Sequence, residues 1–371
     1  MSKNSKTMTA AVLTGFGGLE KLEIQKNVTI PTPLAGEVLI RVEACGLNNT
    51  DINTRAGWYN KSVRVGTTSE GGSKGFILEP DEQSGGLGNA FKFPRIQGAD
   101  VAGVIVDVGD KVKKTRIGER VLVDPLIRPN DIDQNTGKGG FYLGNGIDGG
   151  FAEYTKVPSI NAIHVNSNLS FEELATFPCS SSTAELMLTR GAVDKNDVVV
   201  ITGATGGVGS AAIQLAKHRG SFVIGICSKR KVEELETLKP DKIITRDGSN
   251  LHAEVANASP SGKIDVVIDV VGGEYFPVWI NALRPGGRYV ASGAIAGPIV
   301  ELDMRSFYLK DLTLIGATHL PADIFLKLVD HIENKNIKPL LGGVFPLTEI
   351  QNAQKEFMKK EHLGNLVIVP S

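Results

Sequence analysis

The sequence predicts an α/β chain of two domains, an antiparallel, barrel-like β domain and a domain built on a parallel sheet. Three observations lead to this prediction. Residues 8–123 alternate short β-type runs with Gly and Pro, whereas residues after Asp194 alternate apolar strands with helices. In addition, a chain of 371 residues exceeds what one compact core usually supports.

The first domain is predicted from short β-type runs such as residues 37–42 and 101–108. Two segments rich in Gly and polar residues, 67–89 and 128–150, interrupt this pattern. Long loops of this kind are either ordinary surface loops, which we favour, or lids over a site. The tail from Lys338 contains two further β-type runs around a helical stretch, and we expect it to return to the first domain.

The second domain is predicted from continuous apolar strands that alternate with helices, a pattern typical of a parallel sheet covered on both faces. Six strands in this order indicate a Rossmann domain. The strands are expected at residues 197–202, 222–227, 242–245, 265–271, 288–292 and 312–317.

Composition excludes several classes of partner. Forty Lys and Arg against 41 Asp and Glu give a formal net charge of -1, so no basic field would attract nucleic acid or an anionic membrane. No apolar run approaches the roughly 20 residues of a membrane helix, and we expect a cytoplasmic protein. Cys45, Cys179 and Cys227 are too scattered for a disulfide framework or a zinc knuckle.

The most specific motif is VVVITGATGGVGSAAIQLAK at residues 198–217, in which a strand is followed by a glycine turn and an amphipathic helix. Such glycines let the backbone approach a pyrophosphate, and the helix N-terminus offers free N–H groups to it. The motif predicts dinucleotide binding, although a structural turn that has lost its ligand is the alternative. The residues expected to contact the cofactor here are Gly206, Gly207 and Val208.

The residues after the second strand of this domain indicate which nicotinamide cofactor binds. NAD-binding proteins place Asp or Glu there, on the adenosine ribose, but this chain has a hydroxyl and three cations instead. Such a group suits a 2′-phosphate. A solvated basic helix start is the alternative, yet cations at a helix N-terminus oppose its dipole. We therefore expect NADP(H), held by Ser228, Lys229, Arg230, Lys231 and Arg246.

Several motifs in the same order resemble the medium-chain dehydrogenase/reductase superfamily, and within it the quinone oxidoreductase and enoyl reductase branches. Besides the glycine turn, they are ACGLNNTD at 44–51, GADVAGVIVDVG at 98–109, GGFAEYTKV at 149–157, ATFPCSSSTA at 175–184, DVVGG at 269–273 and LRPGGRYVASG at 283–293.

This resemblance, which runs nearly end to end, implies the domain organisation. Residues 1–166 and 332–371 would form a GroES-like catalytic domain, and residues 167–331 a Rossmann NADP-binding domain. It also implies a homodimer and a nicotinamide held in the cleft between the domains. The residues that it places near the cofactor are Thr183, Gly272, Gly293 and His319.

The zinc ligands of the zinc-dependent members are incomplete in this chain. Their positions correspond to Asn48, Ala99 and Cys179, and neither an amide nor a methyl group replaces a thiolate or imidazole. The segment 128–150 has no cysteines for the structural zinc lobe. We therefore predict no metal. Cys179 is then either a packed residue beside the cofactor, which we favour, or a nucleophile, for which the sequence identifies no activating group.

Without zinc, substrates that are already electrophilic are favoured, because conjugation spreads the arriving negative charge. By resemblance to mitochondrial-type enoyl reductases, Tyr59 is the candidate proton donor, and a phenol stays protonated at neutral pH. An aromatic anchor at the mouth of the barrel is the alternative for Tyr59. Asn48 either orients a carbonyl group or the cofactor amide, or is a fixed hydrogen-bonding residue of its loop.

These observations predict a zinc-independent, NADPH-dependent oxidoreductase that acts on a small quinone, enone or other α,β-unsaturated carbonyl compound. Two alternatives remain open. One is an NADP-dependent alcohol dehydrogenase or aldehyde-ketone reductase, and the other is a non-catalytic NADPH-binding protein.

Overall fold

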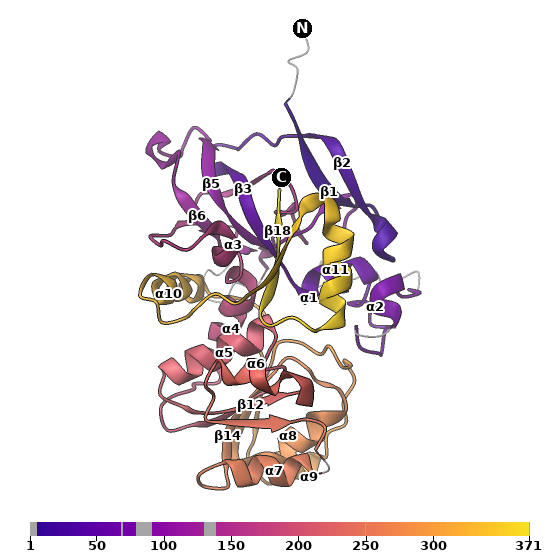
Figure 1. Cartoon of the computed structure of the whole chain (residues 1–371), viewed down its shortest axis with the longest axis vertical. Helices are drawn as coiled ribbons and strands as arrows, with labels where there is room; N and C mark the ends of the chain where they lie inside the picture. The colour runs from indigo at the N-terminus through magenta and orange to yellow at the C-terminus, as the bar shows by residue number, and fades with distance from the viewer. Residues whose placement is uncertain (1–5, 68–69, 79–90, 130–138, 249, 371) are drawn as a thin grey trace.

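The computed structural model describes residues 6–67, 70–78, 91–129, 139–248 and 250–370, and it shows two domains stacked along the long axis (Figure 1). The first and the last described strands, β1 and β18, lie in the upper domain, and α4 (Pro178–Arg190) lies between the two domains. Parts of the two predicted loops, 79–90 and 130–138, lie outside the described residues.

The upper domain contains the predicted antiparallel strands. A seven-stranded sheet has the order β10-β6-β5-β3-β18-β17, with β9 paired to β3, and a three-stranded sheet has the order β2-β1-β4. A two-stranded ribbon pairs β7 with β8, and the β17–β18 pair is parallel. The strands are β1 (Thr7–Leu13), β2 (Leu22–Thr29), β3 (Glu37–Leu47), β4 (Arg95–Ile96), β5 (Asp100–Val108), β6 (Arg120–Val123), β7 (Leu126–Ile127), β8 (Phe141–Tyr142), β9 (Tyr154–Pro158), β10 (Ala162–His164), β17 (Leu341–Pro346) and β18 (Asn365–Val369).

The C-terminal tail completes the upper domain, as predicted. β18 pairs with β3 in a register that places Leu366 opposite Leu47. The helix α11 (Ile350–Lys359) packs near α1 (Asn49–Ala56) and α2 (Glu70–Lys74), as Figure 1 shows. Arg55 of α1 is fully buried and donates a hydrogen bond of 2.8 Å from its Nε to Gln354 of α11. The helix α1 is therefore held in place by α11, from the other end of the chain.

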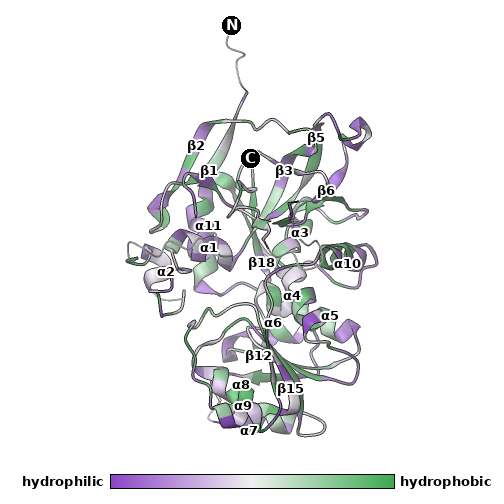
Figure 2. Cartoon of the chain, turned by 180° about the vertical axis from the view of Figure 1, so that it is seen from behind, coloured by the Kyte–Doolittle hydropathy of each residue, from purple (hydrophilic) through white to green (hydrophobic). Residues whose placement is uncertain are grey.

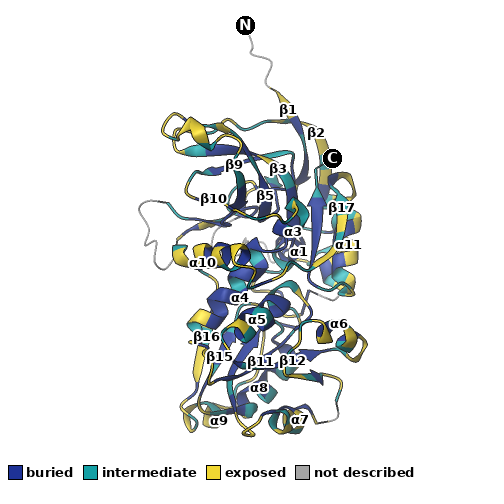
Figure 3. Cartoon of the chain, turned by 60° about the vertical axis from the view of Figure 1, so that its left-hand side comes forward, coloured by how far each residue is buried: buried dark blue, intermediate teal, exposed yellow. Residues whose placement is uncertain are grey.

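The lower domain is a six-stranded parallel sheet in the order β13-β12-β11-β14-β15-β16, which confirms the predicted Rossmann domain. Every residue of β11 is buried, and Figure 3 shows β11 and β12 in the buried interior. The strands are β11 (Val198–Ile201), β12 (Phe222–Cys227), β13 (Lys242–Thr245), β14 (Ile264–Asp269), β15 (Leu283–Ala291) and β16 (Thr313–Gly316). The helices of this half are α5 (Gly207–His218), α6 (Val232–Glu236), α7 (Leu251–Ala258), α8 (Phe276–Ala282) and α9 (Met304–Tyr308).

Two further helices complete the fold, the short α3 (Phe171–Leu174) before α4 and the 12-residue α10 (Ala322–Glu333) after β16. One apolar cluster lies in the upper domain and another in the Rossmann domain, and a third joins residues of both domains around α4. Figure 2 shows hydrophobic residues along much of the strands. The division at residues 166, 167, 331 and 332 remains a prediction. Within the described residues, no helix is both long and apolar enough to cross a membrane.

Candidate active site

A cleft of about 1130 Å³ lies where the two domains meet. The upper domain contributes Asn48 and Tyr59 to its walls, α4 contributes Cys179, and the Rossmann domain contributes the glycine turn. The loop that follows α11 lines the cleft as well, and this loop includes Lys360. The cleft therefore brings together residues from both ends and from the middle of the chain.

The glycine turn has the geometry of a dinucleotide cradle. Gly203 has a φ of +56°, in the left-handed region that favours glycine. A Cβ atom on Gly209 would lie 2.3 Å from the Gly203 carbonyl oxygen, so only glycine allows this close approach of helix and strand. The helix α5 begins at Gly207, with Gly206 as its N-cap, and this end lines the cleft. The turn fits the pyrophosphate of a dinucleotide.

Most of the predicted cofactor residues line this cleft, but two do not. Lys229 is exposed, and its backbone N–H donates a hydrogen bond of 3.1 Å to Asp247. The N–H of Gly272 donates to the buried carboxylate of Asp269 at 3.2 Å, so this glycine belongs to the turn beneath the site. The predicted residues that line the cleft are Thr183, Gly206, Gly207, Val208, Ser228, Arg230, Lys231, Arg246, Gly293 and His319.

The end of the cleft beyond β12 is basic. Arg230 forms an ion pair of 3.2 Å with Glu361, in which both side chains are more than half exposed. The Nε of Arg246 lies 3.8 Å from a carboxylate oxygen of Asp247, and this pair is also about half exposed. Exposed pairs of this kind are weak, so both guanidinium groups can turn to an anionic ligand at little cost.

Two of the three positions that hold catalytic zinc in zinc-dependent relatives, Asn48 and Cys179, belong here to a hydrogen-bonded set around Asp100. The Asn48 amide donates a bond of 2.9 Å to the Asp100 carboxylate, and the backbone N–H of Cys179 donates to the other carboxylate oxygen. The Tyr142 hydroxyl donates to the Cys179 sulfur at 2.9 Å. With Ala99 at the third position, this set does not fit zinc. No group of three or more His, Cys, Asp or Glu in the described ranges could hold a metal ion.

Burial decides the protonation of this set. It raises the pKa of Asp100 to about 8 and that of Asp51, which accepts a 2.8 Å bond from the Asn48 backbone N–H, to about 7. Burial, and then the charge of Asp100, raise the pKa of the Cys179 thiol well above its ordinary value. A thiol that stays protonated is a poor nucleophile, which favours the interpretation of Cys179 as a packed residue.

Two tyrosines border the same part of the cleft. The Tyr59 hydroxyl donates a bond of 3.3 Å to Thr50, and burial raises its pKa above the ordinary value. Tyr142, on β8, was not predicted, because it lies in the segment that the sequence marks as a loop. Burial raises the pKa of Tyr142 well above its ordinary value. Both phenols are therefore protonated at neutral pH and able to donate.

The C-terminal tail packs against the glycine turn and α4. Asn365 is buried, and its Oδ1 accepts a long hydrogen bond of 3.4 Å from Ser180 on α4. A Cβ atom on Gly207 would lie 2.7 Å from this Oδ1, so the tail and α5 touch because Gly207 has no side chain.

A barrel domain joined to a Rossmann domain, with a glycine turn on their shared cleft, defines a nicotinamide-dependent oxidoreductase. The family model described as the alcohol dehydrogenase GroES-like domain matches residues 34–167, and the model described as zinc-binding dehydrogenase matches residues 207–334. The chain belongs to the medium-chain dehydrogenase/reductase superfamily, and the predicted GroES-like and Rossmann classes are both confirmed.

Two solved structures and one further relative are similar to this chain over nearly its whole length. A protein from Sinorhizobium meliloti 1021, provisionally described as an alcohol dehydrogenase, is 45% identical, with a TM-score of 0.89 over 99% of this chain and 97% of that one. A cobalt- and zinc-bound alcohol dehydrogenase from Pyrobaculum aerophilum is 31% identical, with a TM-score of 0.80 over 98% and 100%. Acryloyl-coenzyme A reductase from Sulfurisphaera tokodaii is 28% identical over 98% of this chain and 100% of its own.

Proposed function

We propose that this chain is a zinc-independent, NADPH-dependent oxidoreductase that reduces a quinone, an enone or another α,β-unsaturated carbonyl compound. One observation carries the proposal. The positions where zinc-dependent members hold the metal are occupied by Asn48, Ala99 and Cys179, and the first and last of these bond to Asp100. The Cys179 sulfur also accepts a bond from Tyr142. A site that offers phenols instead of a metal suits acceptors whose conjugation already disperses negative charge.

The preference for NADPH rests on the basic end of the cleft. Ser228 follows β12 where an NAD-binding protein would place an acid, and Arg230 and Arg246 line the same region. A 2′-phosphate would replace the weak partners of these two guanidinium groups with a dianion.

The reduction adds a hydride and a proton to the acceptor, and bound NADPH would supply the hydride. We assign Tyr142 to the acceptor oxygen, where its hydroxyl would exchange the Cys179 sulfur for a better acceptor as negative charge develops. We assign Tyr59 to the proton, which it would give to the acceptor and regain from water in the open cleft. We assign Asn48 a positioning role, because its amide already donates a hydrogen bond to the Asp100 carboxylate.

An alcohol dehydrogenase or aldehyde-ketone reductase is the second candidate. It is favoured by the two solved structures, both described as alcohol dehydrogenases, that are 45% and 31% identical to this chain. The relative named acryloyl-coenzyme A reductase favours the first.

A single assay separates these candidates. NADPH consumption is followed at neutral pH, with a metal chelator present, against quinones, enones, enoyl thioesters and simple aldehydes, and the zinc content of the protein is measured in parallel. Turnover of the conjugated acceptors by protein without zinc would support the proposal. Stoichiometric zinc, with activity that the chelator abolishes, would refute it, and NADPH binding without any turnover would favour a non-catalytic protein.

We also propose a homodimer that forms through β16. This strand ends the six-stranded sheet, and its Leu314 is 38% exposed. Exposed apolar residues also stand in the segment before this strand, among them Met304 and Leu309 at 57% and 69%. An edge strand with an apolar surround is a suitable place for a second copy of the chain to pair.

A further inference from the structure

Residues 58–67, which we call the strap, reach from the upper domain to the Rossmann domain. The Thr67 N–H donates a hydrogen bond of 3.2 Å to the carbonyl oxygen of Ile295. A Cβ atom on Gly66 would lie 2.3 Å from the same oxygen, so the strap approaches this loop closely because Gly66 has no side chain. The contact is one of the places where the two domains touch beside the cleft, since Ile295 lines the cleft.

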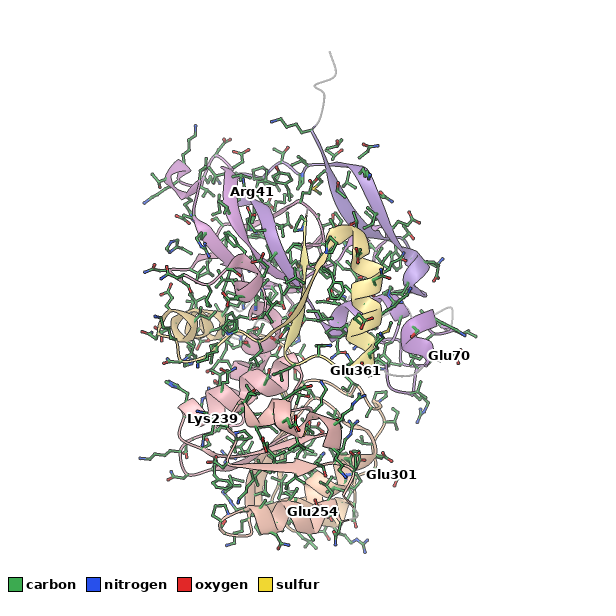
Figure 4. The ribbon with its side chains drawn as sticks, viewed as in Figure 1. Arg41, Glu70, Lys239, Glu254, Glu301 and Glu361 are labelled. Atoms are coloured by element: carbon green, nitrogen blue, oxygen red, sulfur yellow. The ribbon has the colours of Figure 1, made fainter. Side chains whose placement is uncertain are left out.

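The loop that receives the strap is ordered by its own hydrogen bonds. It follows β15, and its Ile295 N–H donates to the Val270 carbonyl at 3.4 Å. Its Ala296 N–H donates to the Val271 carbonyl at 2.9 Å. Figure 4 labels Glu301, which follows this loop in the chain, on the right-hand side of the lower domain. The strap is therefore attached to a fixed part of the Rossmann domain.

Trp58 begins the strap and is held by it. The indole N–H donates a hydrogen bond of 2.8 Å to the Val65 carbonyl oxygen. Between these two residues, the Oδ1 of the buried Asn60 accepts two hydrogen bonds from Ser62, of 2.9 Å from its N–H and 2.6 Å from its hydroxyl. These bonds fix the course of the strap, and they fix the Trp58 side chain with it.

Trp58 also lies beside the proposed proton donor. The rings of Trp58 and Tyr59 have centroids 5.5 Å apart and planes at 72°, which is an edge contact. Trp58 is half-buried, and it lines the cleft together with Tyr59, Tyr142 and Cys179. Because the indole N–H is already bonded to Val65, the surface that Trp58 offers to the cleft is apolar and aromatic.

We propose that Trp58 is a specificity-determining residue of the acceptor site, and that it favours flat ring acceptors such as quinones over open-chain enones. A flat conjugated ring can stack on an aromatic surface, whereas an open-chain enone has little surface to stack. The strap holds the indole in place before the acceptor arrives, which reduces the loss of side-chain freedom on binding. The inference rests on the proposed function and deepens it, because it names one class among the acceptors.

The test measures binding without turnover, in the presence of NADP⁺, which has no hydride to transfer. Dissociation constants for duroquinone, a flat ring, and for mesityl oxide, an open-chain enone, are determined by equilibrium dialysis. We expect Trp58→Leu to weaken the binding of duroquinone about tenfold, because a stacking surface is lost, and to change that of mesityl oxide little. Trp58→Phe should keep most of the affinity for duroquinone, because it retains an aromatic ring.

A second pair of variants tests the strap without changing an aromatic residue. Gly66→Ala places a Cβ atom against the Ile295 carbonyl oxygen, so it should displace the strap and weaken the binding of duroquinone. The tryptophan emission of this variant should move to longer wavelength, because Trp58 gains exposure. Gly36→Ala is the matched control that should change neither property, since a Cβ atom there would meet nothing within 4 Å.

Each outcome has a defined meaning. Unchanged binding of duroquinone by Trp58→Leu, or an equal loss for duroquinone and mesityl oxide, would overturn the inference even if the chain proves to be an active reductase. Conversely, duroquinone binding that depends on Trp58 in a chain without turnover would uphold the site and refute the proposed function. If Trp58→Leu does not fold, Gly66→Ala decides, and a shifted emission with unchanged duroquinone binding would overturn the inference.

Discussion

The hydroxyl of Tyr142 donates a hydrogen bond to the sulfur of Cys179 across 2.9 Å, although 37 positions separate the two residues in the sequence. This contact places a phenol against Cys179, the position where zinc-dependent relatives have a metal ligand. It also ties the β7–β8 ribbon to the start of α4, and so to the boundary between the domains. The first prediction concerns this contact.

Replacing Tyr142 with Phe should lower kcat for conjugated acceptors about a hundredfold, because one donor to the developing oxyanion is lost. The dissociation constant for NADPH, measured by fluorescence, and the KM should change little. Tyr154→Phe, a phenol of β9 outside the cleft, serves as the control. A variant as active as the unmodified chain would remove Tyr142 from the mechanism.

Replacing Tyr59 with Phe should lower kcat about a hundredfold or more, as expected for loss of a general acid. Because burial raises the Tyr59 pKa above its ordinary value near 10, the acid form persists through neutral pH. The solvent isotope effect on kcat, measured with the unmodified chain, should show that proton transfer contributes to the rate. Full activity of Tyr59→Phe would favour the anchor interpretation of this residue.

The cofactor preference is tested by two cations that differ in position. Arg246 lines the cleft and Lys229 does not. Arg246→Ala should therefore weaken the binding of NADPH about tenfold and change the binding of NADH little. Lys229→Ala should leave both affinities unchanged. Dissociation constants for NADPH and NADH are measured with the unmodified chain and with both variants. An equal loss of affinity for NADPH and NADH in Arg246→Ala would argue against a 2′-phosphate site.

Two buried carboxyl groups should make stability depend on pH. Asp51 and Asp100 have folded-state pKa values of about 7 and about 8, above the unfolded value, so the folded chain binds more protons between about pH 4 and 8. The free energy of unfolding should therefore fall as pH rises through this window, by up to about 1.4 kcal/mol per pH unit for each group. Urea unfolding from about pH 5 to about pH 8 measures the slope. It should be shallower for Asp51→Asn, and a flat profile for the unmodified chain would contradict the raised pKa values.

The proposed dimer predicts a mass of twice 39.5 kDa in light scattering after gel filtration. Leu314→Lys should give the monomer mass, because it places a charge on the exposed edge of β16. Leu326→Lys, on the exposed side of α10 that Figure 3 shows in yellow, is the control that should remain dimeric. A monomer in the unmodified chain would exclude pairing at this edge.

Much of the fold follows from local sequence. The six strands and the turn from Gly203 to Gly209 were predictable because burial on both faces requires continuous apolar runs, and a close backbone approach requires glycine. The return of the tail to the first domain followed in the same way from its β-type runs. The missing zinc ligands were visible as well, since an amide and a methyl group cannot take their place.

Side-chain direction was harder to predict. Lys229 stands between Ser228 and Arg230, which both line the cleft, yet it is turned outward. Composition identifies a basic cluster, but the short 3-10 turn at residues 229–231 decides which of its cations line the cleft.

Sequence by itself determined the family, the cradle for the dinucleotide and the loss of the metal ligands, because each depends on residues that are neighbours along the chain. The tertiary structure alone decided that Tyr142 meets Cys179, and that Lys360 and His362 from the tail meet Lys231 of the Rossmann domain. These groups are brought together by the packing of two domains on α4 and by the pairing of β18 with β3. Contacts of that kind have no periodic signal in the sequence, since they are fixed by the shape of the whole chain rather than by any one segment.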